Sequence, residues 1–89
     1  METLELNAPI ASKRTFSKNI QYLMRQKGID VDQLAVELDI EKSRISPWLN
    51  QACYPKIDML VKVCLYFGVT DKMFRLLTES IIPEKVVYH

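Results

Sequence analysis

A chain of 89 residues is long enough for one hydrophobic core, and a composition of 48% hydrophobic and 26% charged residues is typical of a globular protein. No apolar run approaches the ~20 residues of a membrane-spanning helix, and residues 1–11 hold two glutamates and no cation, unlike a secretory signal. We therefore expect a cytoplasmic protein. The net charge of +1 is uninformative, but residues 13–56 hold eight cations against five acidic residues, so the positive excess lies there.

The first predicted helix ends at Gly28. Apolar residues recur on one helical face before this glycine, at Phe16, Ile20, Leu23 and Met24. Glycine readily adopts the left-handed conformation that ends many helices, so the spacing and the glycine together predict a helix and its C-terminal cap.

Two short helices are expected between residues 30 and 50. Asp30 can cap the first through its carboxylate, with Gln33 in the position of a capping box. Asp39 marks the turn between them, because aspartate tolerates the left-handed conformation better than most residues. The apolar residues expected inside are Leu34, Ala35 and Leu38 in the first helix, and Ile45, Trp48 and Leu49 in the second.

The outward face of the second of these helices carries two cations and two hydroxyl groups. If Ile45 and Trp48 point inward, helical spacing directs five residues outward, namely Lys42, Ser43, Arg44, Ser46 and Pro47. Pro47 leaves two alternatives. We favour a kinked or tolerated proline inside the helix; the other is a late start with Ser46 as N-cap, which would leave residues 42–44 outside a regular helix.

Two further helices bring the expected number to five, in a compact all-α domain over residues 15–79. One ends at Gly68 and is expected to bury Ile57, Leu60, Val61, Cys64 and Phe67. The other begins at Thr70 and Asp71. The apolar residues in and after this last helix exceed what one short helix usually hides, so they are candidates for a dimer interface, with simple core burial as the alternative: Met73, Phe74, Leu77, Ile81 and Ile82.

The two ends of the chain are interpreted as an N-terminal arm, residues 1–14, and a C-terminal tail, residues 80–89, with a role in dimerisation. Leu4 and Leu6 alternate with polar residues, as do Val86 and Tyr88. This alternation predicts short extended segments that pair with each other or across a dimer. Frayed ends are the outcome that we favour.

No residue pattern indicates an enzyme, a metal site or a cofactor site. The single histidine is the last residue, and Cys53 and Cys64 do not have the spacing of zinc ligands. There is no glycine-rich phosphate loop and no pair of carboxylates at a catalytic spacing. We therefore expect free thiols, no metal, no cofactor and no catalytic activity.

From about Phe16 to Leu77, apolar, glycine and polar residues follow one another at characteristic intervals. The residues in this pattern are Ile20, Leu23, Gly28, Leu34, Ala35, Leu38, Ile40, Ile45, Ser46, Trp48, Asn50, Pro55, Leu60, Phe67, Gly68 and Val69. In this spacing the chain resembles the phage Cro/CI repressor type of helix-turn-helix, the XRE family. The resemblance implies a lambda-repressor-like five-helix DNA-binding domain. Its third helix would lie in the major groove of double-stranded DNA, usually as a homodimer on a pseudo-palindrome.

The resemblance also implies roles for individual residues. The base-reading positions correspond to Lys42, Ser43, Arg44 and Pro47, and Arg44 is expected to read guanine because a guanidinium can donate two hydrogen bonds to O6 and N7. The phosphate-contacting positions correspond to Val31, Asp32, Ser46, Gln51, Tyr54 and Lys56, although Tyr54 can instead cover the loop. The core positions correspond to Leu34, Ala35, Leu38, Ile45, Trp48, Leu60 and Phe67.

Two departures from the family pattern support a second hypothesis. Val31 stands where the family usually has a glutamine that touches the DNA backbone. Met24 and Leu49 stand where many members have an arginine–glutamate pair; since both partners are replaced, we expect Met24 to pack on Leu49. With Pro47 and the weak net charge, these departures favour a protein-interaction or antitoxin-like module with weakened DNA binding. The first hypothesis is a sequence-specific DNA-binding regulator of transcription, of phage-repressor or bacterial transcription-factor type.

Overall fold

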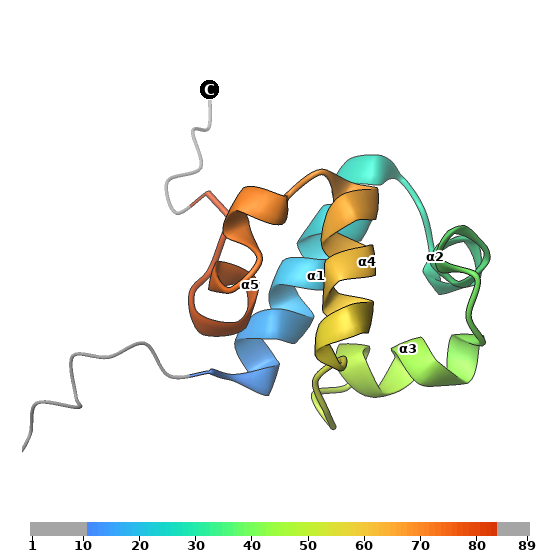
Figure 1. The fold of residues 1–89 in the computed structure, drawn as a ribbon, viewed down its shortest axis with the longest axis horizontal. Coiled ribbons are helices and arrows are strands. Elements are labelled where there is room, and N and C mark those ends of the chain that lie inside the picture. The colour runs from blue at the N-terminus through green and yellow to red at the C-terminus, as the bar shows by residue number, and fades with distance from the viewer. Residues whose placement is uncertain (1–10, 84–89) are drawn as a thin grey trace, which may run out of the picture.

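The computed structural model describes residues 11–83, and in this part of the chain all regular structure is helical. Five α-helices and one 3₁₀ turn follow one another: α1 (Lys13–Lys27), α2 (Val31–Leu38), α3 (Lys42–Leu49), α4 (Ile57–Phe67), η2 (Thr70–Lys72) and α5 (Arg75–Thr78). In Figure 1, α1 and α4 form the middle of the molecule, α5 lies on one side, α2 on the other, and α3 runs along the lower edge. The five-helix prediction is confirmed. The extended segments expected at Leu4, Leu6, Val86 and Tyr88 lie outside the described residues.

The predicted helix ends are found where capping residues occur. Ser12 caps the start of α1, because its hydroxyl accepts from the Thr15 amide (3.1 Å). Gly28 caps the end of α1 in the left-handed conformation, with a φ of 70°. Asp30 begins α2 by accepting from the Gln33 amide (2.9 Å), as expected. The Gln33 side chain, however, donates to the Glu37 carboxylate (2.7 Å), so it stabilises the next turn of α2.

The core lies between all five α-helices. Phe16 and Trp48 meet edge to face with ring centroids 6.3 Å apart, which joins α1 to α3. Six of the seven predicted core residues are buried; Phe67 is half-buried at the edge of the core. The buried apolar residues are Phe16, Ile20, Leu23, Met24, Leu34, Ala35, Leu38, Ile45, Trp48, Met59, Leu60, Val63, Cys64 and Leu76.

The buried face of α4 differs from the prediction. Leu60 and Cys64 are buried as expected, but Ile57 and Val61 are exposed, and Met59 and Val63 are buried in their place. All residues of α4 except Asp58 and Lys62 are apolar, so the spacing alone does not define one face. The observed rotation also lets Lys62 donate from its ammonium group to the Leu38 carbonyl at the end of α2 (2.6 Å).

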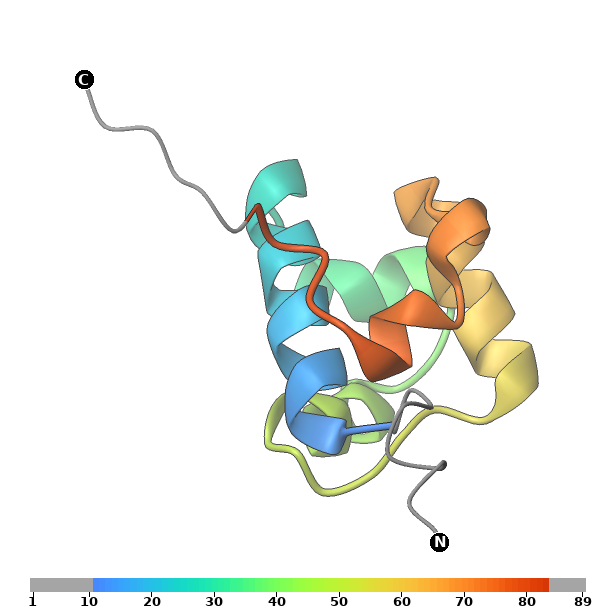
Figure 2. The same cartoon turned by 90° about the vertical axis from the view of Figure 1, so that its left-hand side faces the viewer.

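The last predicted helix is split into η2 and a four-residue α5. The end of α5 is held by α1, where the fully buried Asn19 amide donates to the carbonyls of Leu76 and Glu79 (both 2.9 Å) and its oxygen accepts from the Ile81 amide (3.0 Å). These bonds replace the continuation of the α5 ladder and hold residues 76–81 against α1. Figure 2 shows this orange-to-red segment crossing back from α4 to α1.

Candidate nucleic-acid interface

Pro47 lies inside α3, which spans Lys42–Leu49, so the alternative of a late helix start is wrong. A proline at this position removes one hydrogen bond, the one that its amide would donate to the Ser43 carbonyl. Ser43 is exposed, so water can reach this carbonyl. The ladder resumes where the Asn50 amide donates to the Ser46 carbonyl (3.0 Å), so residues 42–44 belong to the same helix as Trp48.

The outward face of α3 carries the predicted base-reading residues. Ile45 and Trp48 are buried, whereas Lys42, Ser43, Arg44 and Ser46 are exposed. Pro47 was also expected on the outward face, but it is half-buried rather than exposed. Its carbonyl accepts from the amides of Ala52 (2.8 Å) and Cys53 (3.3 Å). These two bonds draw the loop after α3 back toward the helix.

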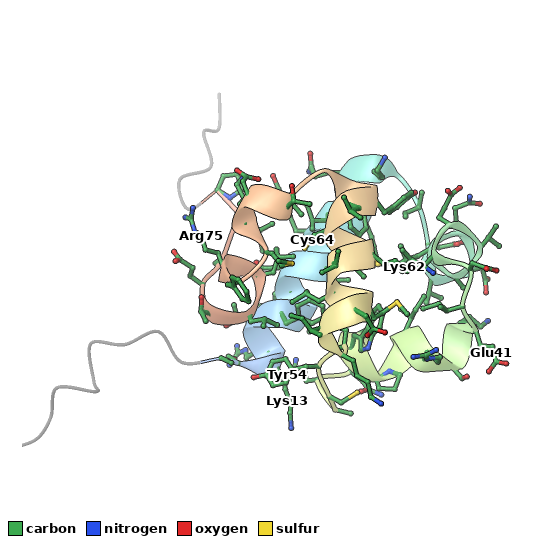
Figure 3. All side chains as sticks on the ribbon, viewed as in Figure 1. Lys13, Glu41, Tyr54, Lys62, Cys64 and Arg75 are labelled. Carbon is green, nitrogen blue, oxygen red and sulfur yellow. The ribbon has the colours of Figure 1, made fainter. Side chains whose placement is uncertain are left out.

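The loop between α3 and α4 brings residues together that are far apart in the sequence. Arg44, Tyr54 and Lys56 line one hollow of about 230 Å³, together with Pro47, Trp48, Cys53, Pro55 and Met59. Gln51 turns the chain with a φ of 68°, a left-handed conformation that sequence reasoning did not anticipate. Figure 3 shows Tyr54 low in the middle of the molecule, next to Lys13, and Glu41 at its right-hand end. Tyr54 is half-buried against the core, so it covers the loop while its edge borders the hollow.

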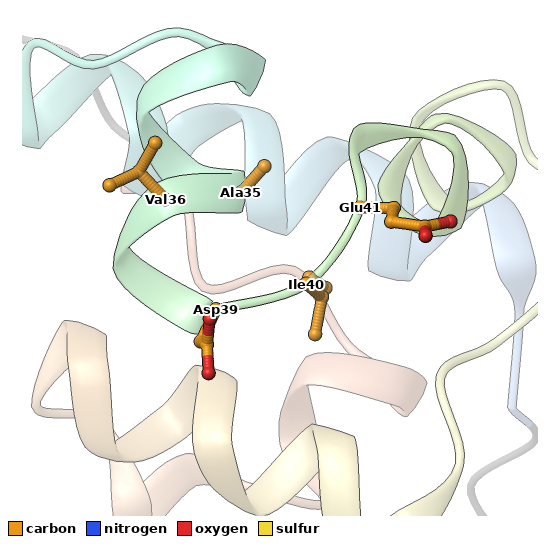
Figure 4. A pocket seen from close by; sticks show the side chains of 5 residues that line it. All are labelled: Ala35, Val36, Asp39, Ile40 and Glu41. Atoms are coloured by element: carbon orange, nitrogen blue, oxygen red, sulfur yellow. The ribbon is translucent and has the colours of Figure 1, made fainter.

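A tight turn sets the angle between α2 and α3. Asp39 has a φ of 57°, as predicted for this position, and the Ile40 amide donates to the Ala35 carbonyl (3.0 Å). Ala35 and Asp39 border a shallow depression whose other lining residues are Val36, Ile40 and Glu41 (Figure 4). The small side chain of Ala35 lets the turn fold this closely on α2.

The starts of α2 and α3 are joined by an ion pair that sequence reasoning missed. The Lys42 ammonium lies 2.9 Å from the Asp32 carboxylate, with 55% and 70% of the two side chains exposed. This hydrogen bond, followed by the charges of Asp32 and Asp30, raises the pKa of Lys42. Ten residues separate the partners, so only the packing of α2 against α3 could have indicated the pair. Val31, also expected near phosphate, is half-buried against the core.

The carboxyl end of α3 is held by polar groups of α1. The Ser17 hydroxyl donates to the Leu49 carbonyl (2.7 Å), and the Gln21 amide donates to the same carbonyl (3.4 Å) and to the Ser17 oxygen (3.0 Å). Met24 is buried and Leu49 packs against the same core. A direct contact between these two side chains stays a prediction.

The order of helices, the turn at Asp39 and the exposed face of α3 are those of a helix-turn-helix. A family model described as a Cro/C1-type HTH DNA-binding domain matches residues 19–70, which include α2, the turn, α3 and the loop. The chain belongs to the Cro/C1-type helix-turn-helix family. The family predicted from the sequence is thereby confirmed, and so is the lambda-repressor-like fold.

A solved structure similar to this Cro/C1-type domain is the solution structure of the SOS-response transcriptional repressor LexA from Eubacterium rectale. The two superpose with a TM-score of 0.69 over 88% of this chain and 81% of that chain, at 14% sequence identity. At this identity the likeness concerns the fold alone. No curated protein matches the sequence. No helix in residues 11–83 has both the length and the apolar character required to span a bilayer.

Proposed function

We propose that this Cro/C1-type domain binds specific sequences of double-stranded DNA, with α3 in the major groove, and regulates transcription. The observation that carries the proposal is the exposed face of α3, because Lys42, Ser43 and Arg44 project from a helix whose opposite side is fixed in the core by Ile45 and Trp48. An α-helix fits the major groove, where each base pair presents a distinct pattern of donors and acceptors. We assign residues 15–79 to the binding domain, 1–14 to an arm and 80–89 to a tail.

Base reading and phosphate binding are assigned to neighbouring parts of this surface. Arg44 is the guanine reader, and Lys42 and Ser43 contact adjacent bases. Lys56 and Tyr54 bind phosphate, since they share one hollow with Arg44 and a phosphate there would lie beside the groove that α3 enters. Ser46 and Gln51 flank this hollow in the chain and are assigned to the DNA backbone as well. The backbone amides at the start of α2, at Val31 and Asp32, are also assigned to a phosphate.

The domain is proposed to act as a homodimer, because a pseudo-palindromic site needs two copies of α3. Phe74 is the strongest interface candidate: 65% of it is exposed, which is unusual for a large aromatic residue. Met73, Leu77 and Ile81 pack partly against the core, and Ile82 is half-buried beside them in sequence. Replacing Phe74 by Ser should shift the wild-type dimer toward monomer in sedimentation equilibrium. An unchanged dimer would exclude this face.

The decisive experiment is a selection of preferred sites from randomised duplexes, followed by titration of the selected duplex with wild-type protein and Arg44→Ala. Loss of a bidentate guanine contact should weaken binding by about 1–3 kcal/mol and relax the preference at one base pair. Arg75→Ala is a matched control, because Arg75 is exposed on α5 rather than on α3. If Arg44→Ala retains full affinity and sequence preference, the base-reading assignment is wrong.

A second candidate function is a protein-interaction or antitoxin-like module in which DNA binding is weak. The ion pair between Asp32 and Lys42 favours it, because the first cation of α3 is already neutralised by this chain's own carboxylate. A gel-shift with random genomic DNA at low salt separates the two functions. Binding that weakens steeply as salt is added supports phosphate contact, whereas no binding under these conditions favours the protein partner.

A further inference from the structure

The ion pair between Asp32 and Lys42 joins the two helices of the candidate interface. Lys42 is the first residue of α3 and Asp32 the second residue of α2, and their charged groups are 2.9 Å apart. More than half of each side chain is exposed, so the pair fills no gap in the core. Exposed ion pairs typically contribute only about 0–1 kcal/mol to stability, so stability gives little reason for this arrangement.

The charge around Lys42 is acidic rather than basic. Asp30 caps α2, Asp32 follows it, and Glu41 precedes α3, and the charges of both Asp32 and Asp30 act on Lys42. The start of α2 stabilises negative charge through its free amides and its dipole. The carboxylates of Asp30 and Asp32 therefore lie at the end of α2 that attracts anions, so a DNA phosphate at this end would lie close to negative charge from the protein.

A phosphate and a guanine make different demands on Lys42. A phosphate must compete with the Asp32 carboxylate for the same positive charge and must approach that carboxylate closely. Guanine O6 and N7 are neutral acceptors, and an ammonium that gives one hydrogen to Asp32 keeps two more to donate. The ion pair therefore weakens contacts with arbitrary phosphates more than contacts with the correct base.

Resting on the DNA-binding function proposed above, we propose that Asp32 is a positioning residue that raises sequence specificity by holding the Lys42 ammonium for base contact and withholding it from phosphates. The preference arises through a penalty on unspecific binding rather than through an added attraction. Asp32 acts through Lys42, and this dependence is what the experiment tests.

The test compares Asp32→Asn, Lys42→Met and the double variant with wild type, on a labelled random-sequence duplex and on the selected duplex. Asparagine keeps the size of Asp32 and removes only its charge. Glu79→Gln is the matched control, because it removes the acidic partner of another exposed ion pair, with Arg75 on α5 (3.4 Å). Thermal unfolding of all variants checks that the fold is retained.

Asp32→Asn should tighten binding to random DNA by about fivefold at 0.1 M salt and steepen the plot of log K against log salt by about one, the value of one added phosphate contact. Affinity for the selected duplex should change less, so the ratio of specific to random affinity falls. In the Lys42→Met background, Asp32→Asn should have no such effect, and Glu79→Gln should leave both affinities unchanged. A merely structural ion pair would change the unfolding temperature but not the salt slope.

Equal tightening by Asp32→Asn with and without Lys42 would refute the inference, because it would show simple repulsion between Asp32 and DNA. Unchanged or weaker binding of random DNA by Asp32→Asn would also refute the role of Asp32. If the wild-type protein still binds the selected duplex in that case, the proposed DNA-binding function is unaffected. If the wild type shows no salt-dependent binding to either duplex, the proposed function fails and the role of Asp32 fails with it.

Discussion

Replacing Asn19 by alanine should lower the free energy of unfolding strongly, although it removes only one small side-chain amide. Asn19→Ala deletes two donated hydrogen bonds and one accepted one that join α1 to residues 76–81. The Leu76 carbonyl becomes an unpaired group in a buried position, whereas the Glu79 carbonyl and the Ile81 amide are only part-buried and water can reach them. The expected loss therefore comes mainly from one acceptor.

The magnitude follows from these environments. One buried unpaired acceptor costs about 1–3 kcal/mol, and each part-buried group adds about 0.5–1 kcal/mol. The total of about 2–5 kcal/mol is a large part of the ~5–15 kcal/mol by which small domains are stable. At about 4–8 °C per kcal/mol for a domain of this size, the unfolding temperature should fall by about 8–40 °C.

Urea unfolding followed by circular dichroism measures this loss directly. Gln26→Ala, at an exposed position on the same helix, is the control and should change the free energy of unfolding by less than about 0.5 kcal/mol. Hydrogen exchange should also accelerate at the Ile81 amide, which loses its acceptor. If Asn19→Ala loses less than about 1 kcal/mol, the reasoning is refuted, because the Leu76 carbonyl would then have found another donor.

Three further predictions follow from the caps, the thiols and the loop. Gly28→Ala should cost about 1 kcal/mol in urea unfolding, because φ is 70° there but no atom lies within 4 Å of an added Cβ; a loss above about 3 kcal/mol would indicate a clash instead. Native protein should react rapidly with one equivalent of a chromogenic thiol reagent, at the exposed Cys53, because Cys64 is buried and burial raises the pKa of its thiol; two rapid equivalents would contradict this. Lys56→Ala should weaken binding to all DNA sequences alike and flatten the salt dependence by about one unit, measured by fluorescence titration; a sequence-dependent loss would assign Lys56 to base reading.

Local chemistry made much of the helix-turn-helix predictable. Gly28 and Gly68 end helices because both adopt the left-handed conformation, and Asp30 caps α2 because its carboxylate reaches a free amide. Trp48 is buried because it shares a helical phase with Ile45. Each of these features depends on residues within one or two turns of each other, so spacing in the sequence was sufficient.

Features that depend on contacts between distant elements were not predictable from spacing. The buried face of α4 was predicted correctly at Leu60 and Cys64 but wrongly at Ile57 and Val61, because nearly all residues of α4 are apolar and the packing of the other helices selects the rotation. The role of Asn19 could not be predicted either, because the backbone groups that it binds lie 57–62 positions away in the sequence. In the candidate interface, the positions of Lys42 and Arg44 on α3 were predicted, but the partner of Lys42 was not, because it lies on another helix.

The support of α3 has a consequence for how such a domain can diversify. Its carboxyl end is clamped to α1 through Ser17 and Gln21, and its inner face is locked by Ile45 and Trp48, none of which belongs to the outward set at positions 42–44. Exchanging that set would remove the ion pair between Asp32 and Lys42 but would leave the hydrogen bonds to α1 and the core packing of Ile45 and Trp48 in place. A library varied only at positions 42–44 should therefore yield mostly folded proteins. If these residues read DNA bases as proposed, members of the library should prefer different DNA sequences.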